Sequence, residues 1–227
     1  MGFRQYRAMV RKDLLSELRT RETVVAMFLF VVLAMVVFHY AFTVTGGGAL
    51  SFYTGGMLWV VFVFGALLGL NRSFAHEKDE RVLDGLLLCP VDRVTIFLAK
   101  MTGNLVFLGL IQIVAVPVFV LFFAPRGMAG HLAELLVLIV LADLGIAALG
   151  TLLATIAMQT RARDLLLPIV FLPLVIPLVI AAASGTSTLL SGGTGASGVL
   201  GRLVFLLVYD GVFLVLAYGT YDVAIGE

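Results

Sequence analysis

Six long apolar runs, separated by short polar or glycine-rich segments, dominate the pattern along the chain. They are Thr23–Thr45, Phe52–Leu70, Thr95–Phe123, Ala133–Ala157, Leu165–Ala183 and Val199–Gly219. At about 1.5 Å of rise per helical residue, each run is long enough to cross a hydrocarbon core of about 30 Å. The pattern therefore predicts an all-α polytopic membrane protein with six transmembrane helices, forming a single transmembrane domain over residues 1–227.

The segment before the first run predicts a helix of another kind. Its apolar residues recur at spacings of three and four: Phe3, Tyr6, Val10, Leu14 and Leu18. Basic residues fall between them, at Arg4, Arg7, Arg11 and Lys12. We expect an amphipathic helix that lies in the cytoplasmic interface of the lipid bilayer. The alternative is a basic retention signal that happens to be helical, which also places the segment at the inner membrane surface.

The distribution of charge predicts the orientation. The segments expected on the same side of the membrane as the N-terminus carry 13 Lys and Arg residues. Those expected on the opposite side carry two, Arg126 and Arg202. By the positive-inside rule, both termini are expected in the cytoplasm, in a multi-pass protein of the inner membrane. A composition of 61% apolar and 13% charged residues excludes an ordinary soluble domain. The single cysteine, Cys89, permits no internal disulfide.

One inner segment, residues 71–94, combines many charged residues with a short leucine run. It is strongly charged as far as Asp84, becomes apolar at Leu86–Leu88 and stops at Pro90, which cannot continue a helix. We expect a short helix that lies across the membrane surface with an apolar ridge. The alternative is a solvated loop with a leucine run that dips into the membrane. The outer connections 46–51, 124–132 and 184–198 are short or bland, and the last, rich in Gly, Ser and Thr, is expected to be a flexible connector.

Together, an amphipathic first helix, six spans and a charged inner loop resemble the permease half of an ABC exporter. Three segments resemble the haem exporter protein B family (CcmB) more narrowly. They are Gly69–Pro90, containing HEKDERVLDGLLLCP, then Leu149–Ala183, and the C-terminal YDGVFLVLAYGTYDVAIGE. The resemblance covers essentially the whole chain, with the tract 184–198 as a local departure. It implies a permease that works with a CcmA-like ATP-binding subunit and with CcmC-like and CcmD-like membrane subunits. The complex would either drive haem toward a periplasmic chaperone for c-type cytochromes or use ATP hydrolysis to release the haem-loaded chaperone.

The residues agree with this division of labour. No Gly-Lys pair occurs, so the chain has no phosphate-binding loop of the Walker type. ATP hydrolysis is therefore expected on a partner chain, and this chain is expected to be no enzyme and to hold no metal or cofactor of its own, with haem as the possible cargo. Because ABC transporters close two ATPases face to face, we expect a second copy of the chain in the assembly, and no nucleic-acid partner.

Other function classes stay open at this point. The first is the permease of another ABC exporter, for drugs or glycans. A proton-coupled secondary transporter would use ionisable residues at the midplane, but the chain has no evident inverted repeat. A b-type cytochrome subunit would need histidine pairs within the spans, which the sequence lacks.

The inner segment contains the expected ATPase-docking residues. They are Glu77, Glu80, Arg81, Leu83, Asp84, Leu86 and Leu87. The charged residues would set the register of the contact and the leucines would supply its buried anchor. The alternative docking site is Arg161–Asp164, in the next inner loop.

Several residues within the spans are candidates for function. Asp143 and Asp210 each lie about 15 Å from the outer end of a span, near the membrane midplane. Because an ionised carboxylate is costly there, both should face protein or water. Either each carboxyl group only bonds a neighbouring helix, or Asp210 belongs to a polar cluster that changes during the ATP cycle.

Proline and histidine give further hypotheses. Pro168, Pro173 and Pro177 are expected to leave the fifth span bent or partly unwound, as a moving gate element or as a static kink. His39 and His131 lie near the outer face, where they are interfacial polar residues or axial haem ligands. His76 is expected to take part in the ATPase contact.

Small residues form two stripes that could bring helices close together in lipid. One is Gly65 with Gly69, and the other comprises Gly145, Ala147, Gly150, Thr151 and Ala154. Each stripe would pack either within the chain or at the interface with a second copy.

Overall fold

Seven helices account for nearly all of the residues that the computed structural model describes, which are 2–20, 22–44, 50–79, 92–123, 130–158, 163–191 and 195–225. The helices are α1 (Gly2–Thr20), α2 (Glu22–Val44), α3 (Leu50–Asp79), α5 (Arg93–Phe123), α6 (Leu132–Met158), α7 (Arg163–Leu190) and α8 (Gly195–Ile225). All except α1 are long and apolar enough to cross a membrane. The predicted all-α fold with six spans is therefore confirmed.

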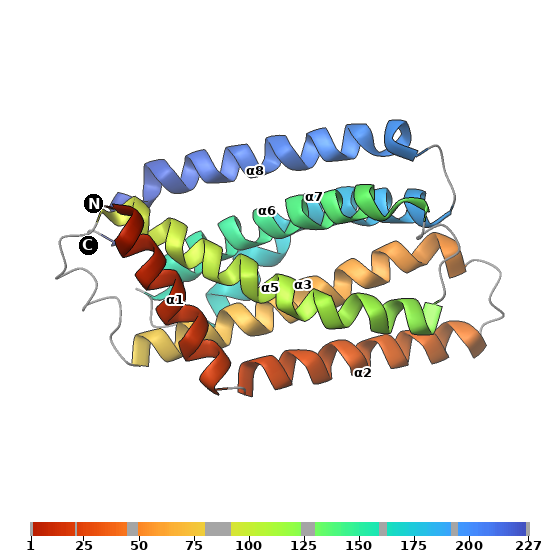
Figure 1. Ribbon diagram of the computed structural model, residues 1–227, viewed down its shortest axis with the longest axis horizontal. Coiled ribbons are helices and arrows are strands. Elements are labelled where there is room, and N and C mark those ends of the chain that lie inside the picture. The colour runs from red at the N-terminus through yellow and green to blue at the C-terminus, as the bar shows by residue number, and fades with distance from the viewer. Residues whose placement is uncertain are drawn as a thin grey trace.

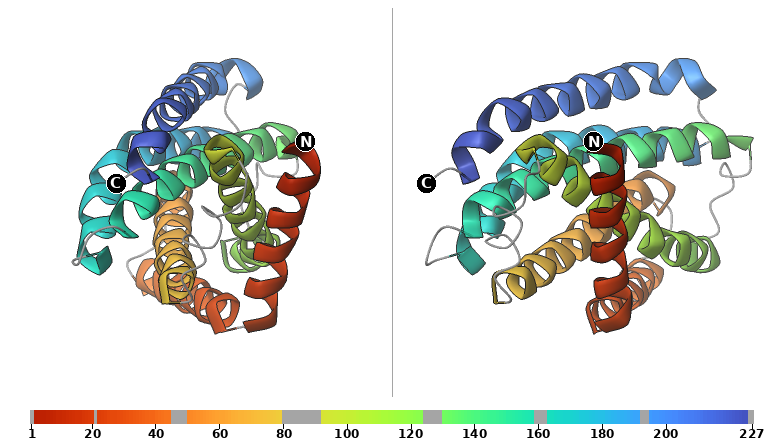
Figure 2. Two further views of the ribbon diagram at one scale, coloured as in Figure 1. Left: turned by 90° about the vertical axis from the view of Figure 1, so that its left-hand side faces the viewer. Right: turned by 60° about the vertical axis from the view of Figure 1, so that its left-hand side comes forward.

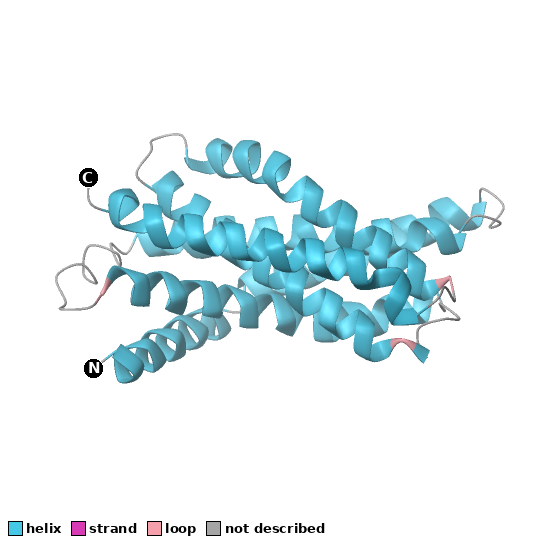
Figure 3. Cartoon of the chain, turned by 90° about the horizontal axis from the view of Figure 1, so that it is seen from above, coloured by secondary structure: helices cyan, strands magenta, loops and turns pink. Residues whose placement is uncertain are grey.

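The six long helices run along one direction and α1 crosses them at one end (Figures 1 and 3). The start of α1 and the end of α8 lie at this same end, as an even number of spans requires. The end of α3 and the start of α5 also lie there (Figure 1). We call it the terminal end of the bundle.

Helices α3 and α6 form the centre of the bundle, and α2 and α8 lie at opposite edges (Figures 1 and 2). In α3 and α6, 72% of the membrane-length segment is buried, against 17% in α2 and α8. The core residues of α6 include Leu138, Ala142, Ala147 and Leu149, all with no measurable exposure. The two edge helices leave broad apolar faces for lipid or for other subunits.

Small residues in α3 and α6 let these two central helices pack closely against their neighbours. A Cβ atom added to Gly69 would lie 2.6 Å from the sulfur of Met27 in α2, and one added to Gly150 would lie 2.5 Å from a methyl carbon of Leu70. Thr151, in the same stripe, is fully buried and accepts a hydrogen bond from Asn104 of α5. Both stripes therefore pack within the chain, and the hypothesis that they form a face for a second copy is wrong.

The tract 184–198 is not the flexible connector expected from its composition. Helix α7 continues to Leu190 and α8 begins at Gly195, so that only residues 192–194 of the tract lie outside the described residues. Thr186 and Thr188 donate hydrogen bonds to carbonyl groups four residues earlier in α7. Their hydroxyl groups are satisfied by the helix itself, which allows a polar sequence to remain helical.

The same tract packs against α3. The indole Nε1 of Trp59 donates to Oγ1 of Thr186 over 2.9 Å, and both side chains are fully buried. A Cβ atom on Gly55 would lie 2.6 Å from the carbonyl oxygen of Ala183. The small residues of the tract are therefore contact residues, which let the backbones of α3 and α7 approach closely.

The three prolines of the fifth span lie inside one continuous helix. Pro168, Pro173 and Pro177 all fall within Arg163–Leu190, and α5 carries a further proline, Pro117, in its interior. The expected partial unwinding of this span is therefore wrong. Each proline removes one backbone donor, and neighbouring helices can satisfy the freed carbonyl groups. A bend or gating movement at these prolines stays a prediction.

Candidate functional site

The predicted ATPase-docking segment lies almost wholly outside the described residues. Glu80, Arg81, Leu83, Asp84, Leu86 and Leu87 all belong to the undescribed stretch 80–91. Glu77 lies in α3, which extends nine residues beyond the predicted span limit at Leu70, and nothing is described of its side chain. The end of α3 and the start of α5, which flank this stretch, both lie at the terminal end of the bundle (Figure 1), and α5 packs against α1 there.

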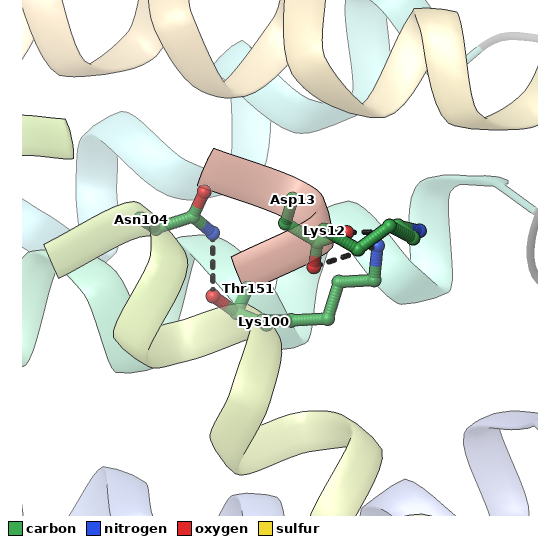
Figure 4. Close-up of polar contacts among 5 residues, drawn as sticks. All are labelled: Lys12, Asp13, Lys100, Asn104 and Thr151. Carbon is green, nitrogen blue, oxygen red and sulfur yellow. Dashed lines mark hydrogen bonds and ion pairs between the residues drawn. The ribbon is translucent and has the colours of Figure 1, made fainter. Parts of the chain in front are cut away.

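A polar contact fastens α1 to α5 at this end. The hydroxyl group of Tyr6 donates to Oγ1 of Thr102 over 2.7 Å. The carboxylate of Asp13 lies between two lysines, with Oδ1 2.9 Å from Nζ of Lys12 and Oδ2 3.6 Å from Nζ of Lys100 (Figure 4). Lys100 is only 5% exposed, so its charge depends on partners within the protein.

The contact follows from the amphipathic pattern of α1. At about 100° per residue, Tyr6 and Asp13 share one side of the helix. The predicted interfacial residues Arg4, Arg7, Arg11 and Lys12 are all exposed, on the rest of the surface. Lys100 is one of the 13 basic residues that predict the orientation, and the sequence gives no reason to pair it with Asp13, 87 positions earlier. The available signal was a carboxylate on the side of α1 that is otherwise apolar.

Polar side chains continue along α5 into the bundle. One turn beyond Lys100, Nδ2 of Asn104 donates to Oγ1 of Thr151 in α6 over 2.9 Å (Figure 4). Two turns further, Nε2 of Gln112 donates to Oδ1 of Asp143 over 2.7 Å, and both residues are buried. The predicted midplane carboxylate Asp143 therefore has a partner that sequence reasoning missed, although an isolated glutamine within an apolar run was the signal for it.

Asp143 and Gln112 line a small cavity between α2, α3, α5 and α6. Its other lining residues include Met27, Phe62 and Gly65. The centre of a water molecule can move within a volume of about 10 Å³ in this cavity, so the cavity holds about one water. The cavity is too small for a haem. Asp143 therefore lies at a junction of four helices, where its hydrogen bond holds α5 to α6.

Asp210, the other midplane carboxylate, has a different environment. It is 3% exposed, and neither carboxylate oxygen has a hydrogen-bond partner among the described residues. It lies against Gly145, where an added Cβ atom would come within 2.5 Å of Oδ1. Because Gly145 and Asp143 are two residues apart, they lie on nearly opposite sides of α6, so Asp143 and Asp210 do not form a pair.

Tyr209 fastens α8 to α7 beside Asp210. Its hydroxyl group donates to the backbone carbonyl oxygen of Leu174 over 2.7 Å. Tyr209 therefore gives α8 a polar contact with α7, whereas the carboxylate of Asp210 packs against Gly145 of α6 without a hydrogen bond among the described residues. Whether this cluster changes during an ATP cycle stays a hypothesis.

The outer histidines have separate surroundings. The ring of His39 lies among aromatic rings, with centroid distances of 5.3 Å to Phe122 and 5.8 Å to Phe123. Nδ1 of His131 lies 3.8 Å from Oε1 of Glu134, one turn along α6. The part of the chain that the structure describes has no group of three or more His, Cys, Asp or Glu residues arranged to hold a metal ion. The side chain of His76 is not described.

The sequence matches the family described as CcmB protein over residues 4–225. Heme exporter protein B of Paracoccus denitrificans is 30% identical over 171 residues, which are 75% of this chain and 76% of that protein. Heme exporter protein B of Rhodobacter capsulatus is 30% identical over 138 residues (60% and 62%), and that of Pseudomonas aeruginosa is 26% identical over 137 residues (60% and 60%). The chain thus spans about three fifths of the length of the last two relatives. Because the family match extends from α1 to the last residues of α8, the chain belongs to the CcmB family.

Proposed function

We propose that this chain is the permease subunit of an ABC-type haem exporter, or haem-chaperone release complex, for c-type cytochrome biogenesis. The observation that carries the proposal is the family match over residues 4–225, in a family whose similar members are named heme exporter protein B. The six membrane-length helices supply the scaffold that such a permease needs.

A separate, CcmA-like ATPase supplies the energy. The chain has no phosphate-binding loop, and the segment 80–91 joins α3 to α5 at the terminal end of the bundle, where an ATPase in the cytoplasm would dock. Helix α5 begins directly after this segment and is fastened to α1 through Lys100 and Thr102. A displacement of the docking segment would therefore act on α5 and α1 together.

The complete assembly contains a second copy of the chain and CcmC-like and CcmD-like subunits, in the inner membrane with both chain termini in the cytoplasm. The exposed apolar faces of α2 and α8 are among the surfaces that these partners can cover, because the small-residue stripes are used within the chain. Haem is the cargo of the complex, and no resident cofactor is proposed for this chain.

The proposal is tested by purifying the tagged chain from cells that also express the ATPase. We expect the ATPase to co-purify, the complex to show a haem absorption spectrum, and a strain lacking the chain to lose c-type cytochromes. The variant Arg81→Glu/Leu87→Asp should lose the ATPase while remaining inserted, because it reverses a charge and removes an apolar anchor. The control Arg161→Glu/Asp164→Lys, in the other inner loop, should retain the ATPase.

Each alternative gives a different result. An ATPase that co-purifies without haem, in a strain with normal c-type cytochromes, indicates another ABC exporter, for drugs or glycans. Loss of the ATPase only in the Arg161→Glu/Asp164→Lys variant moves the docking site to Arg161–Asp164. A chain that never binds an ATPase contradicts the proposal.

A further inference from the structure

Helix α1 carries arginines on the side that faces away from the bundle. Arg4, Arg7 and Arg11 are exposed, and at about 100° per residue they fall within a sector of about 60°. Tyr6 and Asp13, which contact α5, lie on the opposite side. We call Arg4, Arg7 and Arg11 the arginine stripe.

The position of α1 brings this stripe to the level of the membrane surface. Helix α1 lies across the spanning helices at the rim of the bundle (Figures 1 and 2). The first span, α2, begins at Glu22, two residues after α1 ends. The outward side of a helix in this position faces the lipid headgroup layer.

The arginine stripe carries positive charge that no ion pair among the described residues neutralises. Among the residues that the structure describes, the ion pairs at this end of the bundle join Asp13 to Lys12 and Lys100, and they do not include the three guanidinium groups. Guanidinium groups bind phosphate oxygens through paired hydrogen bonds, and three of them in one line match a row of headgroups. We propose that the arginine stripe binds anionic phospholipid headgroups of the cytoplasmic leaflet.

Lys12 connects this lipid site to the contact between α1 and α5. Its side chain is 48% exposed and lies about 80° around the helix from Arg4, between the stripe and Asp13, and its Nζ is 2.9 Å from Oδ1 of Asp13. A headgroup phosphate bound at the stripe competes with Asp13 for the ammonium group of Lys12. When Lys12 binds the phosphate, the carboxylate of Asp13 keeps only its ion pair with Lys100. The charge of the surrounding lipid therefore acts on the contact that holds α1 against the helix after the predicted docking segment.

The proposal is tested by native mass spectrometry of the full-length chain in a neutral detergent, titrated with phosphatidylglycerol or phosphatidylcholine. The wild type should bind phosphatidylglycerol more tightly, and rising salt should remove this preference. Arg7→Gln/Arg11→Gln should weaken phosphatidylglycerol binding about fivefold for each charge, or about 25-fold, and leave phosphatidylcholine binding unchanged. Arg7→Lys/Arg11→Lys keeps the charge and should retain most of the preference.

The matched control is Arg161→Gln/Arg163→Gln, which removes the same charge from another inner segment and should keep wild-type lipid binding. An equal loss in this control assigns the preference to general positive charge and overturns the proposal. So does a wild type without preference for phosphatidylglycerol, or an unchanged affinity in Arg7→Gln/Arg11→Gln. Because the salt dependence is measured on the wild type, the test holds even if a variant fails to fold.

Discussion

The ion pair between Asp13 and Lys100 predicts an asymmetric response to mutation. Asp13→Asn removes the carboxylate and leaves the buried ammonium group of Lys100 without its charged partner in α1. Lys100→Met leaves Asp13 paired with Lys12 at 2.9 Å, in a position that is partly open to water. We therefore expect Asp13→Asn to destabilise the chain more than Lys100→Met, although each removes one member of the same pair.

The magnitude follows from distance and burial. Charges 3.6 Å apart attract by about 5 kcal/mol at an effective dielectric constant of about 20, before the cost of removing them from water is subtracted. Removing one partner of a buried pair typically costs about 3–5 kcal/mol, because the other charge stays buried. Asp13 is 16% exposed and therefore partly screened by water, so we expect a value at or just below the bottom of this range, about 2–3 kcal/mol, for Asp13→Asn, and about 1 kcal/mol for Lys100→Met. In the double variant neither charge of this pair is left in the contact, so it should be more stable than Asp13→Asn alone.

The assay is denaturant unfolding of the full-length chain in detergent micelles, followed by the fluorescence of Trp59. This residue is the only tryptophan and is fully buried in α3, so its emission reports unfolding of the bundle. A crosslink between cysteines at positions 6 and 102, in a Cys89→Ser background, measures separately whether α1 stays on α5. The reasoning is refuted if Lys100→Met is the more damaging variant, or if the two substitutions are additive in the double variant.

Three further predictions follow from the packing and the topology. Gly55→Ala should lower the free energy of unfolding by about 1–3 kcal/mol, because the added methyl group meets Ser187 and the carbonyl group of Ala183. The control Gly56→Ala meets nothing within 4 Å and should be neutral or stabilising. Thermal melting of the two variants measures the difference. Asp210→Asn keeps the shape of a side chain that has no partner among the described residues, so assembly of the complex should persist. Asp210→Leu should reduce assembly. Normal cytochrome c maturation in Asp210→Asn, measured by haem staining, would exclude a titrating role of Asp210 in the ATP cycle. Reporter fusions after Glu227 and between Gly192 and Gly193 should report cytoplasm and exterior, and the reverse pattern would contradict the six-span topology.

The sequence by itself was sufficient for the number of spans, the amphipathic first helix and the family. These features depend on length and on the cost of placing charge in hydrocarbon, which are properties of each segment taken alone. The alternation of apolar residues with Arg4, Arg7 and Arg11 likewise needs no neighbouring helix to be recognised. The docking role of Glu77 to Leu87 stays a prediction, because most of that segment lies outside the described residues.

Only the tertiary structure decided which faces of the spanning helices meet. These helices are apolar on almost every side, so their sequences lack the 3.6-residue alternation that separates a buried face from an exposed one. The pairs Gln112 with Asp143, and Asp13 with Lys100, join residues 31 and 87 positions apart, and each exists only because α5 lies beside both α6 and α1. The tract 184–198 shows the same limit. Its small polar residues are typical of a flexible linker when the sequence is considered alone. Against Gly55 and Trp59 they instead permit close packing of α3 and α7, which depends on a neighbouring helix and is not encoded in the linear pattern.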